Sequence, residues 1–236
     1  MPALSAIDAD TGTGTGTGAG GLAGGSTALI AGVAPESVVQ KMGQKPNDMQ
    51  LQLQGCEVLS TLFEADAAGK SLSAANARAI PVLLRILRVF GHKLEVQLAV
   101  WRPLLQMVSA QPFLRKLLLE QGGMKLILSG LDACRSDATV LTQLCHACRI
   151  LLPSTPPRPF VEAGGLELLV ESILAHPKCA PLAEVGGACL HMLSGINHIV
   201  RRSTRTHGTI EPYMRLAALG HAACPCRRLL VHLTTD

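Results

Sequence analysis

Glu120-Gln121-Gly122-Gly123-Met124-Lys125-Leu126-Ile127 sets a pair of glycines directly before an apolar helix start, and Val161-Glu162-Ala163-Gly164-Gly165-Leu166-Glu167-Leu168-Leu169 does the same. Two more apolar helix starts extend this series, at Ile80-Pro81-Val82-Leu83-Leu84 and Ile210-Glu211-Pro212-Tyr213-Met214. The four starts, at positions 80, 124, 166 and 210, are separated by 44, 42 and 44 residues, and a weaker fifth copy begins near position 36. A spacing of about 40 to 47 residues is typical of arrays in which each unit is a small group of helices. The sequence therefore predicts a helical repeat array.

The composition favours helices over sheets. Apolar residues make up 48% of the 236 residues, aromatic residues make up only 3%, and Leu and Ala are abundant. Leu and Ala favour helices, whereas sheets are enriched in β-branched and aromatic residues. No strand-type alternation stands out, so we expect an all-α fold.

Each unit is predicted to contain a short helix, a glycine turn, a middle helix, a loop and a long helix. The expected helices cover 113–120, 124–131 and 140–152 in one unit, and 159–163, 166–174 and 182–194 in the next. Of the paired glycines, one can adopt the left-handed conformation that ends a helix. The other has no side chain, which lets the following helix leave at a steep angle.

The first 33 residues differ from the rest of the chain. Thr and Gly alternate from Thr11 to Gly18, and glycine pairs follow. Because glycine loses the most backbone entropy on ordering and the stretch has little to bury, we expect residues 1–33 to be a disordered Gly/Thr-rich tail. The helical array is expected over residues 34–236.

The glycine junctions quoted above resemble those between the first and second helices of armadillo repeats. The segments 52–62 and 187–194 resemble the third helix of that family. The resemblance covers about residues 35–233. It implies a right-handed α-α superhelix, or solenoid, of about four armadillo repeats plus partial terminal units.

Prolines depart from the armadillo pattern in two places. Pro103 lies inside a predicted third helix, where it removes a backbone hydrogen bond, so we expect a kink or a split there. The segment 153–159 carries four prolines in place of much of a first helix and is expected to be a stiff, extended connector. No obvious polar cap follows the last expected helix, so either Arg227, Arg228 and His232 supply one or the chain is part of a longer solenoid.

Partner-binding residues are expected on the third helices, because the resemblance implies that these helices line the concave groove of the solenoid. Their outward positions form two rows at repeat spacing, one with Glu57, Arg102, Arg149 and His191 and one with Thr61, Gln106 and Gly195. In the nuclear-import adaptors of the family these rows carry Trp and Asn. The residues found here disfavour that function and indicate a groove of mixed to positive charge.

The predicted function is a non-catalytic scaffold or adaptor that binds an extended peptide segment or a helix of a partner protein in this groove. The alternative is an armadillo portion of a larger signalling, cytoskeletal or ciliary protein that positions an attached module. Trp101 has two interpretations, as a core residue between repeats or as an exposed hot spot in the groove.

Other classes of function find little support in the sequence. No grouping of Ser, His and Asp and no paired carboxylates indicate catalysis, so no cofactor or small-molecule substrate is expected. Cys145-His146-Ala147-Cys148 lacks a second pair of zinc ligands, so we expect no metal. The net charge of +4 comes from scattered basic residues, which disfavours nucleic acid, and no apolar run is long enough to predict a membrane span. Eight cysteines without a compact disulfide framework indicate reduced thiols and a cytoplasmic protein, with a nuclear or cytoskeletal location as alternatives.

Overall fold

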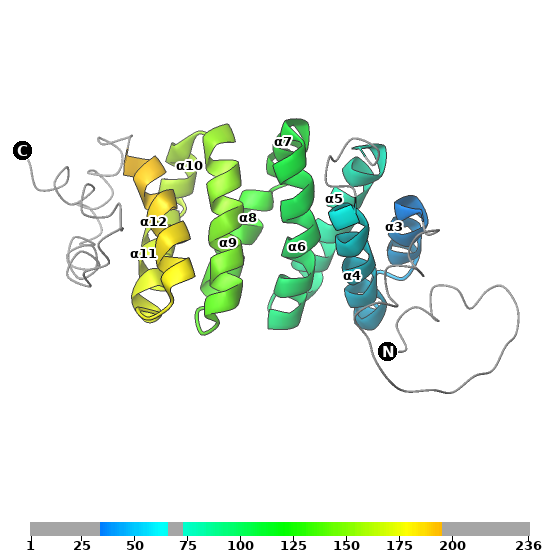
Figure 1. Cartoon of the computed structure of the whole chain (residues 1–236), viewed down its shortest axis with the longest axis horizontal. Helices are drawn as coiled ribbons and strands as arrows, with labels where there is room; N and C mark the ends of the chain where they lie inside the picture. The colour runs from blue at the N-terminus through cyan, green and yellow to red at the C-terminus, as the bar shows by residue number, and fades with distance from the viewer. Residues whose placement is uncertain (1–33, 66–72, 195–236) are drawn as a thin grey trace, which may run out of the picture.

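The computed structural model describes residues 34–65 and 73–194, and every regular element in these two stretches is a helix (Figure 1). The all-α prediction is therefore confirmed for this part of the chain. The expected tail, the helix start at position 210, Gly195 and the terminal cap lie outside the described residues. In chain order the elements are α3 (Pro35–Gln44), α4 (Met49–Ala65), α5 (Ser73–Phe90), α6 (Leu94–Ala110), α7 (Pro112–Glu120), α8 (Gly123–Ala133), α9 (Ala138–Leu151), the 3₁₀ helix η1 (Leu152–Ser154), α10 (Pro157–Glu162), α11 (Gly165–Ala175) and α12 (Ala180–Ser194).

Four long helices, α4, α6, α9 and α12, lie side by side in the order of the chain (Figure 1). Helix α6 packs against α4 on one side and against α9 on the other, and α9 packs in turn against α12. Helices α8 and α11 lie behind α9 and α12 in this view and contact each other. The buried apolar side chains form one continuous cluster from α3 to α12. The fold is thus an extended arrangement of helices in layers, with its core between them.

Two glycines in the left-handed conformation set the turns after the short helices. Gly122, between α7 and α8, has a φ of 83°, and Gly164, between α10 and α11, has a φ of 77°. The first turn is also held by Arg88 of α5, whose Nη2 donates a hydrogen bond to the carbonyl oxygen of Gln121 at 2.6 Å. The left-handed role expected of one glycine in each pair is confirmed.

The second glycine of each pair leaves no room for a side chain. A Cβ at Gly123 would lie 2.7 Å from Leu118 Cγ, and a Cβ at Gly165 would lie 2.6 Å from ring atoms of Phe160. Because Leu118 and Phe160 belong to the preceding short helices, this close approach fixes the starts of α8 and α11 against them.

The prolines are accommodated within helices more fully than the sequence predicts. Helix α6 continues from Leu94 to Ala110 with the buried Pro103 inside it, so the expected split is wrong. Packing of α6 against helices on both sides offsets the lost hydrogen bond. The extended connector expected over 153–159 is also wrong, because η1 and α10 occupy most of it and only Thr155 and Pro156 are extended between them. Pro157 opens α10, where its fixed φ suits the first turn and no helical amide bond is lost.

Trp101 lies in the core, so its interpretation as an exposed groove residue is wrong. Its side chain is 1% exposed, and its Nε1 donates a hydrogen bond to Oε1 of the buried Gln97 at 2.7 Å. Gln97 Nε2 donates to the carbonyl oxygen of Gly91 at 2.6 Å. A buried indole N–H requires an acceptor. Gln97, one turn earlier in α6, provides this acceptor through Oε1. Through Nε2 it also holds the turn that joins α5 to α6.

We expect Gly164→Ala to lower the free energy of unfolding by about 1 to 2 kcal/mol, because alanine resists the left-handed backbone conformation. Gly43→Ala is the matched control, since Gly43 lies in α3 with open space where a Cβ would be. Alanine at Gly43 should be neutral or should stabilise by up to about 1 kcal/mol. Urea unfolding followed by circular dichroism measures both variants, and equal stabilities would contradict the role assigned to Gly164.

We expect Gln97→Leu to destabilise the fold by about 1 to 3 kcal/mol, because it leaves the buried indole N–H of Trp101 without an acceptor and removes the hydrogen bond to the partly buried carbonyl oxygen of Gly91. In a Trp101→Phe background the same substitution should cost less, since the indole donor is already gone. Thermal and urea unfolding of the four proteins in this double-mutant cycle measure the coupling. Strictly additive effects would show that the hydrogen bond between Gln97 and Trp101 contributes nothing.

Candidate interaction surface

Apart from Gly195, the predicted binding residues lie on the row of long helices. Helix α4 carries Glu57 and Thr61, α6 carries Arg102 and Gln106, α9 carries Arg149, and α12 carries His191. Thr61 and Gln106 are half-buried and the other four are exposed. The opposite sides of the same helices supply core residues, among them Leu59, Leu104, Leu144 and Leu190. Amphipathic helices packed side by side thus produce one outward surface, named here the polar face and made of Glu57, Thr61, Glu64, Arg102, Gln106, His146, Arg149, Glu184 and His191.

Glu64 joins α4 to α6 across the polar face. Its Oε1 forms an ion pair with Arg102 Nη2 at 2.7 Å and accepts a hydrogen bond from Gln106 Nε2 at 3.0 Å. Ser60 Oγ donates to Gln106 Oε1 at 3.3 Å. The structure therefore brings Arg102 and Gln106 together through a carboxylate that the sequence prediction omitted. The signal was present, because Glu57, Thr61 and Glu64 continue the helical spacing of four and three residues along one side of α4.

At the other end of the polar face, His146 of α9 lies beside Arg149 on the same helix and close enough to Glu184 of α12 to be influenced by its charge. Asp137 caps the N-terminus of α9, and its Oδ1 accepts hydrogen bonds from the amides of Thr139 and Val140 at 2.9 Å each. Nη2 of Arg149 is 3.5 Å from His146 Nδ1. Burial and then the positive charge of Arg149 lower the pKa of His146, while Glu184 opposes them. No carboxylate of the described residues lies within ion-pair distance of Arg149, so its guanidinium remains available for a partner.

The cysteines of α9 point inward while the neighbouring histidine faces out. Cys145 and Cys148 are fully buried, and His146 between them in the sequence is half-buried. Cys189 of α12 donates a hydrogen bond from Sγ to the carbonyl oxygen of Cys145 at 3.3 Å, which links the two helices. Burial raises the pKa of Cys189 to about 12 and also raises the pKa of Cys145 and of Cys148. These thiols therefore remain neutral at physiological pH and act as small apolar groups.

The described residues contain neither a metal-binding cluster nor a helix suited to crossing a membrane. Within 34–65 and 73–194, no three His, Cys, Asp or Glu side chains are placed to hold a metal ion. No helix in the described part of the chain combines the length and hydropathy that a membrane crossing requires.

Comparison with known proteins adds no assignment: no family model matches the chain, and no curated protein or solved structure matches it significantly.

We expect the free energy of unfolding to fall as the pH rises above about 9, because burial raises the pKa of Cys56 from 9.0 to about 12. The unfolded chain then loses a proton that the folded chain keeps, at a cost of about 1.4 kcal/mol per pH unit for each such thiol. Urea unfolding at pH 7.5 and pH 10 measures the loss. Cys56→Ala should show a smaller loss than the unmodified protein, whereas an identical pH dependence would exclude Cys56 as a source.

Proposed function

We propose that this chain is an armadillo-type α-solenoid that acts as a non-catalytic scaffold, holding an extended segment or a helix of a partner protein along the polar face. The observation that carries the proposal is the unbroken row α4, α6, α9 and α12, in which each helix adds exposed polar side chains to one surface. The two left-handed glycine turns, at Gly122 and Gly164, support the same repeat arrangement. Four adjacent helices give a long, shallow surface that suits an elongated partner.

The contacts between helices favour binding because they order the polar face in advance. Glu64 holds Arg102 and Gln106 in place across α4 and α6, so less side-chain entropy is lost when a partner docks. Arg149 offers a guanidinium that can pair with a partner carboxylate in a bidentate manner. Arg102 serves the same purpose only in competition with Glu64. We therefore assign Arg149 the larger part in binding.

The free state of the cysteines indicates the compartment in which such a scaffold would act. All six cysteines of the described residues are free, and five of them are buried. Free thiols persist in reducing compartments, which supports the proposal that the protein acts in the cytoplasm.

Site-specific photo-crosslinking tests the proposal directly. A photoreactive residue at position 149 should capture the partner, while one at Lys125, an exposed position on α8, should not. Capture at position 125 with none at position 149 would place the binding surface on the other layer and overturn the proposal.

Once a partner has been identified, the double variant Arg102→Ala with Arg149→Ala should weaken its binding by about 1 to 3 kcal/mol. Arg85→Ala with Lys125→Ala removes two exposed cations on α5 and α8 and is the matched control. Stability should change little in either double variant, because exposed ion pairs contribute only about 0 to 1 kcal/mol. Isothermal titration measures affinity, and unchanged affinity of the first double variant would remove both arginines from the interface.

A further inference from the structure

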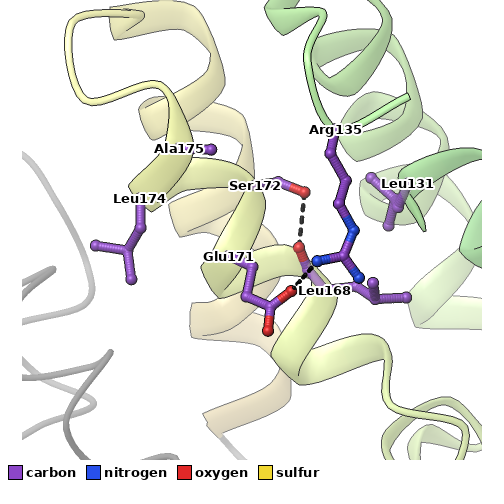
Figure 2. A pocket seen from close by; sticks show the side chains of 7 residues that line it. All are labelled: Leu131, Arg135, Leu168, Glu171, Ser172, Leu174 and Ala175. Carbon is purple, nitrogen blue, oxygen red and sulfur yellow. Dashed lines mark hydrogen bonds and ion pairs between the residues drawn. The ribbon is translucent and has the colours of Figure 1, made fainter. Parts of the chain in front are cut away.

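A hollow of about 330 Å³ lies where α8 and α11 meet, in the layer behind the polar face. Leu131, Leu168 and Ser172 line it together with Arg135 and Glu171, and Leu174 and Ala175 complete the lining. Figure 2 shows the Arg135 side chain reaching from the α8 side toward Glu171 on α11. Binding sites for small ligands occupy about 300 to 1,000 Å³, so this hollow is large enough for one bulky side chain and little more.

The polar groups of the hollow already have partners. Ser172 Oγ donates to the carbonyl oxygen of Leu168 at 2.6 Å. Arg135 forms an ion pair with Glu171 through Nη1 at 2.7 Å and with Asp132 through Nη2 at 2.6 Å, and its Nε also donates to Asp132. The rest of the lining consists of the apolar side chains of Leu131, Leu168, Leu174 and Ala175. The occupant that fits is apolar.

The charged residues around the hollow indicate which kind of apolar group it binds. Asp132 and Glu171 bind Arg135 through in-plane N–H groups, and the Arg135 side chain is still 54% exposed, so the plane of its guanidinium can stack against an aromatic ring. Asp132, Glu171 and Arg135 together carry one net negative charge, which complements a neighbouring cation. We infer that the hollow between α8 and α11 is a docking site for an aromatic side chain that lies next to a lysine or arginine on a partner protein. This site is separate from the polar face and does not depend on the function proposed for it.

Short peptides test the inference on the full chain. The probes are N-acetyl-Phe-Lys-amide, N-acetyl-Phe-Glu-amide and N-acetyl-Ala-Lys-amide, titrated against protein with ¹³C-labelled leucine methyl groups. The Phe-Lys peptide should shift the methyl signals of Leu131 and Leu168, with an affinity at least threefold higher than that of Phe-Glu. The Ala-Lys peptide should leave both signals in place. Equal responses to Phe-Lys and Ala-Lys would overturn the inference, and so would a signal shift that grows with protein concentration in the absence of peptide, since that would indicate a second copy of the chain.

Two variants and a control separate the hollow from the rest of the surface. Ala175→Trp places a large side chain at an exposed position in the lining and should abolish the response to Phe-Lys, whereas Ala180→Trp, also exposed but outside the hollow, should not. Glu171→Gln keeps the shape but removes a negative charge, so the preference for Phe-Lys over Phe-Glu should fall toward one. An undiminished response in Ala175→Trp, or an undiminished preference in Glu171→Gln, would exclude the site.

Discussion

At Gly123 and Gly165 the backbone approaches the preceding helix so closely that a methyl group would overlap Leu118 in one case and the ring of Phe160 in the other. This approach determines the directions in which α8 and α11 leave their turns. Helix α9 packs on α8, and α12 packs on α11, so the placement of both outer helices follows from it. The orientation of Arg149 and His191 toward solvent therefore depends on positions that have no side chain at all.

Much of the fold could be predicted because its determinants are local. The roles of both glycine pairs follow from backbone geometry, and the expected helices at 124–131 and 166–174 correspond to α8 and α11 within two residues at each end. The prolines and Trp101 could not be placed in this way. Whether a helix tolerates Pro103 depends on the packing of α6 against its neighbours, and whether Trp101 is buried depends on Gln97 reaching its indole nitrogen. Both depend on tertiary contacts that spacing does not encode.

Six residues of the polar face were predicted from the sequence, whereas Glu64, His146, Glu184 and the contacts between helices were not. Of the residues that helical periodicity placed on the outside, Glu57, Arg102, Arg149 and His191 are exposed, and Thr61 and Gln106 are half-buried. Helical periodicity gave no register between helices: repeat spacing aligns residues about 45 apart, yet Glu64 meets Arg102 only 38 positions later, while Ser60 meets Gln106 46 positions later. Long side chains can extend along the helix axis in either direction. The length and rotamer of each side chain therefore determine which residue of the neighbouring helix it contacts. The hollow between α8 and α11 also depends on contacts between helices, here on how Leu131 and Leu168 meet. No sequence pattern predicts it.

Trp101 is the sole tryptophan of the chain, and its place in the middle of the helix row has a practical consequence. Its ultraviolet emission reports on one point, the contact of α6 with its surroundings, and on no other part of the molecule. Neighbour-to-neighbour packing allows an array of helices to open first at its ends. Such fraying would lower the helical signal while the emission wavelength stayed constant, and opening at the centre would shift the wavelength at once. The protein thus contains its own optical marker for distinguishing local from global unfolding.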